Sequence, residues 1–337
     1  MPPCQPISRH TKMPESRVHR RELRTSLARE LIFPQVGMHK LIVHIVFLLL
    51  ALGADAQVLV VLPEAEEPKM PHFNEKFIAR NRIAAIHGEI MVKRDNVPMV
   101  TQKEKYLYRF DEQGRITYRN SSFGQPGSGR DTASTIFDYD PNGLLQQKMR
   151  NDLNGHFAYR IERDAKGTPI RETYTRIENL NSDRYKLEPG AITEISDEFY
   201  RYEQVNDTMQ KKIFINDLHL PYREQLFIKN KLGYLTSIED RYLVSNRRSR
   251  ISFHYDDKGR LIERIDQPDI LKEKKTNRVW RYDAAGNVME GELWHDDVQI
   301  DREEYLYEEG TMMLKARLTK DLATNTINVV RFRTELR

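Results

Sequence analysis

The sequence predicts an all-β protein in which consecutive antiparallel β-hairpins form one long twisted or coiled sheet. Three observations lead to this fold class. A Tyr-Asp-x-x-Gly motif recurs along the chain, aromatic residues alternate with other residues beside it, and all 16 tyrosines lie at or after Tyr106. A unit repeated at a near-constant interval is typical of chains built from one supersecondary element. We therefore expect residues 73–337 to form a single repeat-built β domain.

The N-terminal segment has the pattern of a secretory signal. Met38 is followed by His39 and Lys40, by an apolar stretch over residues 41–52, and by the small residues Ala54 and Ala56. A short basic region, an apolar centre and a small-x-small exit are what a signal peptidase recognises. We predict a signal peptide at residues 38–56, with cleavage that leaves Gln57 as the new N-terminus. Residues 1–37 are then an upstream extension from a misplaced translation start.

The alternative for this segment is an uncleaved membrane anchor. Apolar character resumes at residues 58–62, so about 22 residues from Leu41 have the length to span a bilayer. Asp55 falls inside that window, and a carboxylate in hydrocarbon costs roughly 2.5–3.5 kcal/mol, which favours cleavage. Both alternatives predict a secreted, periplasmic or cell-surface location. Cys4 is the only cysteine, so no intramolecular disulfide can form, and the cysteine-free remainder suits an oxidising compartment.

A linker and a short helix are expected before the repeats. Residues 57–72 contain three prolines and several glutamates, which predicts an extended linker. Asn74 can cap a helix over residues 74–82, with Phe77 and Ile78 on its apolar side. The strand-rich region then begins at Ile83.

The repeat itself predicts β-hairpins. The aspartate carboxylate can accept the backbone N–H two residues on, and glycine supplies the left-handed residue that follows a type I turn. We assign as structural turn residues Asp111, Gly114, Asp140, Gly143, Asp164, Gly167, Gly233, Asp256, Gly259, Asp283, Gly286 and Gly310. The long interval between Gly167 and Gly233 predicts an eroded unit, for which Tyr200–Asn206 fits, with asparagine in place of glycine.

This pattern resembles the YD repeat of the Rhs and related wall-associated proteins. The resemblance covers residues 106–317 and is strongest at 255–261 and 282–288. It implies a β-sheet strip that coils into a spiral or shell, secretion or surface exposure, and in some members carbohydrate binding. The chain has only about eight units and no appended toxin domain. Its DPxGL-like run at residues 140–144 is followed by more repeats, so we interpret that run as a hairpin turn and not as a self-cleavage site.

Charge and motifs predict no catalysis. The eight basic and four acidic residues of 1–56 account for the net charge of +4, so the remainder is neutral and lacks the cation surplus of nucleic-acid binders. Arg247, Arg248 and Arg250 form the densest positive run, which we interpret as a solvated loop and strand edge. The histidines do not pair at metal-ligand spacing, and Trp294–Asp297, which could hold a cation, is better explained as a turn. We expect no catalytic residue, metal site or cofactor.

Three functions remain from the sequence. The first is a secreted or periplasmic scaffold with a non-catalytic structural or adhesive role. The second is a carbohydrate- or cell-wall-binding module, which requires solvent-exposed aromatic rows, whereas core packing explains the same aromatics more simply. The third is a component of a toxin-delivery system. The expected partners are a cell-envelope polysaccharide or a surface protein, with no nucleic acid and with membrane contact only through the signal segment.

Overall fold

The computed structural model describes residues 57–65, 68, 70–122, 133–152, 154–183 and 186–337. These residues belong to one compact unit, residues 51–337. The predicted upstream extension and signal peptide, with Ala54 and Ala56, lie outside the described residues.

Antiparallel strands make up almost all of the described chain, as the repeat predicted. The short strands β1 (Leu59–Val60) and β2 (His72–Phe73) pair with each other before the helix α2 (Glu75–Arg80). The remaining strands are β3 (Ile83–Lys93), β4 (Val100–Phe110), β5 (Ile116–Ser122), β6 (Ala133–Tyr139), β7 (Leu145–Asp152), β8 (Gly155–Arg163), β9 (Pro169–Asn179), β10 (Pro189–Asn206), β11 (Met209–Ile215), β12 (Pro221–Lys229), β13 (Leu235–Tyr242), β14 (Arg248–Tyr255), β15 (Leu261–Gln267), β16 (Thr276–Tyr282), β17 (Val288–His295), β18 (Val298–Tyr307), β19 (Leu314–Asp321) and β20 (Ile327–Leu336).

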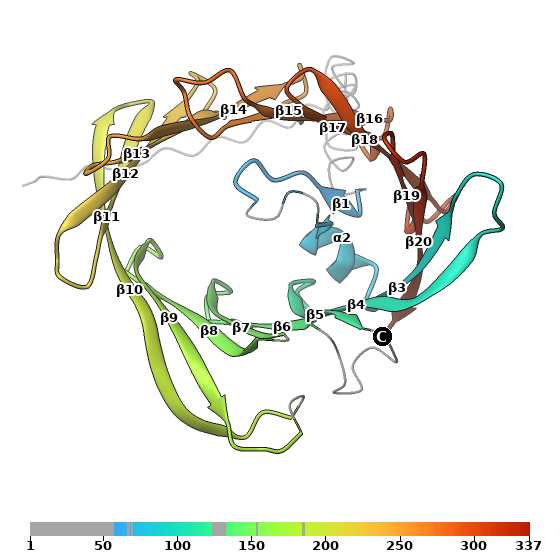
Figure 1. Ribbon diagram of the computed structural model, residues 1–337, viewed down its shortest axis with the longest axis horizontal. Helices are drawn as coiled ribbons and strands as arrows, with labels where there is room; N and C mark the ends of the chain where they lie inside the picture. The colour runs from blue at the N-terminus through green and yellow to red at the C-terminus, as the bar shows by residue number, and fades with distance from the viewer. Residues whose placement is uncertain (1–56, 66–67, 69, 123–132, 153, 184–185) are drawn as a thin grey trace, which may run out of the picture. The chain divides into compact units, whose positions relative to one another are not determined.

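The prediction of an open twisted or coiled sheet is wrong, because the sheet closes on itself. Each strand from β3 to β20 pairs with its sequence neighbours, and β20 then pairs antiparallel with β3, from Ile327 opposite Lys93 to Leu336 opposite Ile83. The result is a closed barrel of 18 described strands (Figure 1). Closure removes both free edges, and an unpaired edge strand is a site of unwanted association.

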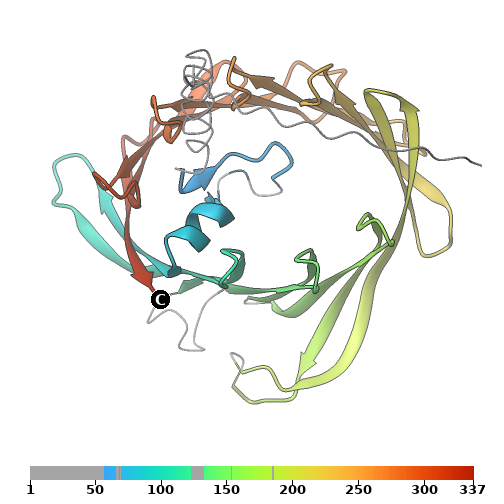
Figure 2. The same ribbon diagram turned by 180° about the vertical axis from the view of Figure 1, so that it is seen from behind.

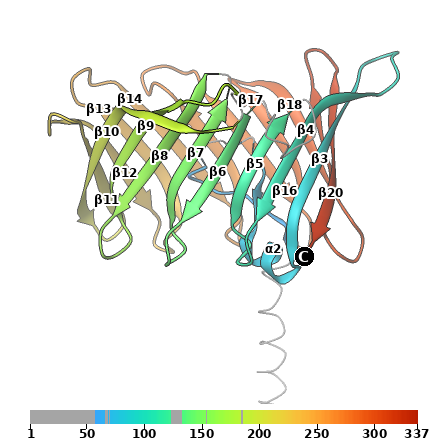
Figure 3. The same ribbon diagram turned by 90° about the horizontal axis from the view of Figure 1, so that it is seen from below.

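The hairpin turns divide between the two ends of this up-and-down barrel. Successive turns alternate between the ends, so all the Asp-x-x-Gly turns fall at one end, which we call the corner rim (Figure 3). The other end, the loop rim, includes the described turns 94–99, 216–220, 243–247, 268–275, 296–297 and 322–326. The glycines of the repeat recur once per hairpin. The number of residues between them is therefore the length of two strands and two turns.

The described residues of 57–82, which we call the plug, lie inside the barrel (Figures 1 and 2). The sequence predicted a linker at 57–72, whereas Val58 and Leu59 are buried against the barrel wall. The predicted helix is confirmed as α2, and the side chain of Asn74 accepts hydrogen bonds from the backbone N–H groups of Lys76 and Phe77.

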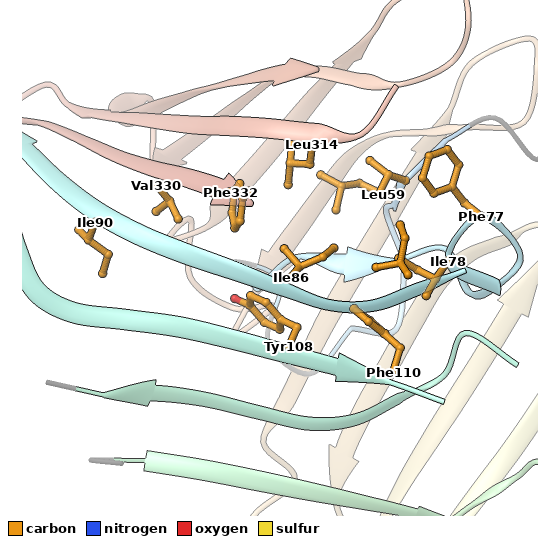
Figure 4. Packing of buried hydrophobic residues seen from close by; sticks show 12 residues of the cluster. Leu59, Phe77, Ile78, Ile86, Ile90, Tyr108, Phe110, Leu314, Val330 and Phe332 are labelled. Carbon is orange, nitrogen blue, oxygen red and sulfur yellow. The ribbon is translucent and has the colours of Figure 1, made fainter. Parts of the chain in front are cut away.

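Two clusters of buried apolar residues hold the plug against the wall. In the first, Phe77 and Ile78 of α2 pack with Tyr108, Phe110 and other inward residues (Figure 4). The second cluster lies on β13–β17 around Phe253 and Trp280, and Val61 of the plug packs against it. The inward side chains of an 18-strand barrel do not fill its interior, and the plug therefore occupies part of that space.

Candidate functional site

The described turn residues lie at the corner rim with the backbone geometry of tight corners. The turn glycines have φ between 77° and 94°, a region that only glycine adopts without strain. At Asp256, the carboxylate accepts hydrogen bonds from the backbone N–H groups of Lys258 and Arg260, at 3.0 and 2.9 Å. Gln57 lies beside the Gly286 corner.

The eroded unit at Tyr200–Asn206 is the end of β10 and leads into the hairpin turn to β11, but Asn206 does not take the glycine role. Its side chain accepts the backbone N–H of Thr208 at 3.0 Å, which is the aspartate role, and it is not among the described residues with positive φ. A corner without glycine does occur at the loop rim. There Asn216 accepts the backbone N–H groups of Leu218 and Leu220, and His219 takes φ of 57°.

The repeated tyrosines join neighbouring hairpins. Before four of the corners, a tyrosine hydroxyl donates to a backbone carbonyl of the preceding hairpin, two residues after that hairpin's turn glycine. The pairs are Tyr139 to Ile116 at 2.8 Å, Tyr255 to Leu235 at 2.7 Å, Tyr282 to Leu261 at 2.5 Å and Tyr307 to Val288 at 2.7 Å. In the loosest copy, the guanidinium of Arg163 reaches the equivalent carbonyl of Leu145 at 3.1 Å. Burial raises the pKa of Tyr139, Tyr282 and Tyr307 well above the usual tyrosine range.

These contacts explain the repeat motif without a ligand. The guanidinium of Arg260 pairs with Asp256 and lies 4.6 Å from the ring centroid of Tyr282, and Arg115 does the same with Asp111 and Tyr139. Sequence reasoning found the aspartates and glycines but missed this interlocking. The sequence does contain a signal for these contacts, because a tyrosine or arginine precedes most of the corner aspartates.

The inner wall from β4 to β9 carries a different pattern, which depends on strand register. Residues directly opposite each other in antiparallel strands share one face of the sheet. Tyr108 faces the interior because its ring packs against Phe73 of the plug at 5.1 Å. The inner row that starts at Tyr108 continues through Arg119, Thr135, Arg150, Phe157 and Arg176. The adjacent inner row runs through Phe137, Lys148, Tyr159 and Tyr174.

Cations and aromatic rings in these two rows, which we call the cationic wall, lie in contact. Arg119 lies 5.8 Å from the ring centroid of Phe137, Lys148 lies 5.5 Å from that of Tyr159, and Arg150 lies 5.4 Å from that of Phe157. Cations within about 6 Å of a ring face are attracted by the ring quadrupole. The sequence did not predict this wall, because nothing in it shows which face of each strand lines the barrel.

A cavity of about 710 Å³ lies between the cationic wall and the plug. Arg119, Lys148 and Arg150 line one side, and the plug contributes Met70 and Phe73. Phe110, Ile116, Leu145 and Leu62 add apolar surface, and Glu64, Glu75 and Glu172 are its carboxylates. The volume lies within the range of roughly 300–1,000 Å³ that small-molecule sites occupy. Burial raises the pKa of Tyr159 to about 12, so this phenol is neutral at physiological pH.

A polar network continues along the inner wall on β9–β12. The hydroxyl of Tyr200 lies 3.4 Å from carboxylate oxygens of both Glu172 and Glu198, and Tyr222 donates to Glu198. The ammonium of Lys212 lies 3.5 Å from the ring centroid of Tyr200. Burial lowers the pKa of Lys212 and raises that of Tyr200, because neither charged form is well solvated there.

The outer wall bears rows of ion pairs. Arg281 alternates with the inward residues Trp280 and Tyr282, so it faces outward, and it pairs at 2.7 Å with both Glu290 and Glu292. Arg302 pairs with Glu290 at 2.9 Å on the next strand. Further outward pairs include Arg250 with Glu239, Arg331 with Glu89, and Arg171 with Asp197 and Glu162.

Among the described residues, no cluster of three or more His, Cys, Asp or Glu side chains has the arrangement of a metal site. Asp296 and Asp297, in the run proposed as a cation-holding alternative, form the turn between β17 and β18, where Asp296 accepts the backbone N–H of Lys275 at 2.9 Å. No helix in the described ranges combines the length and the apolar character needed to cross a membrane.

Comparisons with known proteins assign no family to the chain. No family model matches it, and no curated protein matches its sequence. A porin-like protein from Bacteroides uniformis ATCC 8492 is 12% identical over 75% of this chain and 98% of its own, with a TM-score of 0.34. A porin-like protein from Bacteroides vulgatus ATCC 8482 is 8% identical over 74% and 97%, with a TM-score of 0.28. A LolA superfamily protein from Nitrosomonas europaea is 11% identical over 78% and 91%, with a TM-score of 0.22.

The resemblance to YD-repeat proteins is wrong. No family model for such repeats matches, and the hairpins close into a barrel instead of a coiled strip. The recurrent residues that suggested the family are accounted for by corner geometry and by the contacts between hairpins at the corner rim.

Proposed function

We propose that this chain is a non-catalytic binding barrel of the cell envelope whose lumen takes a small anionic molecule with an apolar chain or ring. The observation that carries the proposal is the cationic wall, where Arg119, Lys148 and Arg150 line one side of a cavity. The three carboxylates of the same cavity come from the plug and from β9. Each of these cations is paired with an aromatic ring. Cations recognise a carboxylate, sulfonate or phosphate, while the rings and the apolar plug residues pack against the remainder of the ligand.

Two features support the envelope location. The pattern at residues 38–56 predicts export, and this remains a prediction. The outer wall bears rows of charged pairs, which are typical of a surface in contact with water. An arginine or lysine on the lipid face of a membrane barrel would cost about 2–4 kcal/mol at mid-bilayer. An aqueous compartment of the envelope agrees with both features.

The carbohydrate-binding alternative requires solvent-exposed aromatic rows. Tyr108 and Trp280 are buried, and the hydroxyl of Tyr282 donates to a backbone carbonyl, so these three aromatics do not support it. We therefore base the proposal on the lumen of the barrel.

The test is a fluorescence titration with the anionic aromatic probe 1-anilinonaphthalene-8-sulfonate on the full chain. We expect Arg119→Gln/Lys148→Gln to weaken probe binding about tenfold or more, because each charge-assisted contact contributes roughly 1.5–3 kcal/mol. The matched control is Arg281→Gln/Arg302→Gln, which removes two cations from the outer wall. Circular dichroism checks that each variant is folded.

A competition experiment distinguishes recognition of the negative charge from nonspecific hydrophobic binding. Dodecanoate should displace the probe, whereas dodecyltrimethylammonium, with the same chain and the opposite charge, should not. Equal loss of binding in the inner-wall and outer-wall variants would contradict the proposal. Displacement by both amphiphiles alike would do so too.

A further inference from the structure

Two neighbouring turns of the loop rim expose large aliphatic side chains. Val244 in the turn 243–247 is 94% exposed, and Leu271 in the turn 268–275 is 90% exposed. These are the highest values among the exposed large hydrophobic side chains of the described residues. The backbone N–H of Ile270 donates to the carbonyl of Arg248 at 3.1 Å, so the two turns are held side by side.

Basic residues flank both aliphatic side chains. Arg247 and Arg248 follow Val244, and Lys272, Lys274 and Lys275 follow Leu271, against only Asp269 and Glu273 in the same segments. Asp269 pairs with Lys272 at 3.4 Å, and Asp297 of a neighbouring turn pairs with Lys275 at 3.4 Å. We call residues 243–248 and 268–275 the rim patch. It has a positive excess although residues 57–337 as a whole carry equal numbers of acidic and basic residues.

This combination is the recognition chemistry of an anionic lipid surface. Lysine and arginine near a bilayer are attracted by acidic headgroups, and aliphatic side chains gain by entering the boundary between headgroups and acyl chains. A protein partner would be expected to use buried aromatic or arginine anchors within a complementary pocket. Val244 and Leu271 instead lie in turns between strands and are almost wholly exposed, so both side chains are accessible for insertion into a soft surface.

We propose that the rim patch docks this barrel on the surface of an anionic phospholipid bilayer. Docking turns the loop rim, and not the corner rim, toward the headgroups. This departs from the expectation that membrane contact is confined to the signal segment. The inference does not depend on what the lumen binds, because it concerns a different surface and is measured without a lumen ligand.

The experiment is cosedimentation of the full chain with vesicles, either phosphatidylcholine alone or phosphatidylcholine with an equal part of phosphatidylglycerol. We expect stronger binding to the anionic vesicles, and a loss of that binding as salt is raised. Val244→Ser/Leu271→Ser should lower the partition coefficient on anionic vesicles about tenfold. Arg247→Gln/Lys274→Gln should lower it by a similar factor and flatten its salt dependence.

The matched control is Leu232→Ser at the corner rim, where Leu232 is 81% exposed. All variants carry the same N-terminal apolar segment, so differences between their partition coefficients come from the substitutions. Unchanged binding by Leu232→Ser supports the proposal. Equal binding of the wild type to neutral and anionic vesicles overturns it. An equal loss of vesicle binding in the loop-rim and corner-rim variants overturns it too. Absence of any vesicle binding also overturns it and would favour a protein partner for the patch.

Discussion

Arg264 links the plug to the barrel wall, and replacing it with methionine should release the plug. The residue is only 8% exposed, and its guanidinium donates to the backbone carbonyls of Pro63 at 3.2 Å and Ala65 at 2.9 Å. The same guanidinium pairs with Asp266 at 2.9 Å. Methionine keeps an unbranched apolar stem and lacks the guanidinium, so Arg264→Met removes all of these bonds and the charge.

The expected loss of stability follows from these contacts. Each hydrogen bond from a charged group contributes roughly 1.5–3 kcal/mol, and two of them reach the plug. Asp266 keeps access to water, since 29% of its side chain is exposed, so the full penalty of an isolated buried charge does not arise. We expect Arg264→Met to lower the free energy of unfolding by about 3 kcal/mol, a large share of the usual 5–15 kcal/mol.

Two measurements check this expectation. Urea unfolding gives the free energy, and hydrogen exchange gives the local effect, because the backbone N–H of Asn74 donates to the carbonyl of Val58 within the plug. That amide should exchange faster in Arg264→Met. The control Arg302→Gln breaks exposed pairs on the outer wall and should cost no more than about 1 kcal/mol. A loss in Arg264→Met no larger than in this control, or unchanged exchange at Asn74, would refute the role given to Arg264.

Two further predictions concern the corner rim. Gly114→Ala places a methyl group against the Glu75 backbone of α2, whereas Gly233→Ala, also at positive φ, meets no atom within 4 Å. We therefore expect losses of about 3 and about 1 kcal/mol on urea unfolding, and equal losses would contradict the contact with α2. The raised pKa of Tyr282 and Tyr307 means that their stabilising effect is complete below about pH 10 and is lost as pH rises further. Tyrosinate absorbance at 295 nm should consequently rise together with alkaline unfolding, and ionisation of these residues near pH 10 in a folded barrel would be inconsistent with it.

Local structure could be predicted from the sequence because its causes are local. Asp256 and Gly259 make a corner through bonds within five residues, and Asn74 caps α2 through bonds within three. The proline- and glutamate-rich segment before α2 was misleading because its position does not depend on local causes. Its composition is typical of a linker, and only contacts with distant residues such as Arg264 place it inside the barrel.

The sequence by itself determined that the chain forms antiparallel hairpins with tight aspartate–glycine corners, since turn geometry depends on neighbouring residues. Only the tertiary structure decided that the sheet closes, because the pairing of β20 with β3 joins segments more than 230 residues apart and needs no special residue in either strand. Closure in turn decided which side chains face inward. The cationic wall exists for that reason, because one register and one direction of curvature bring Arg119, Lys148 and Arg150 to the same cavity.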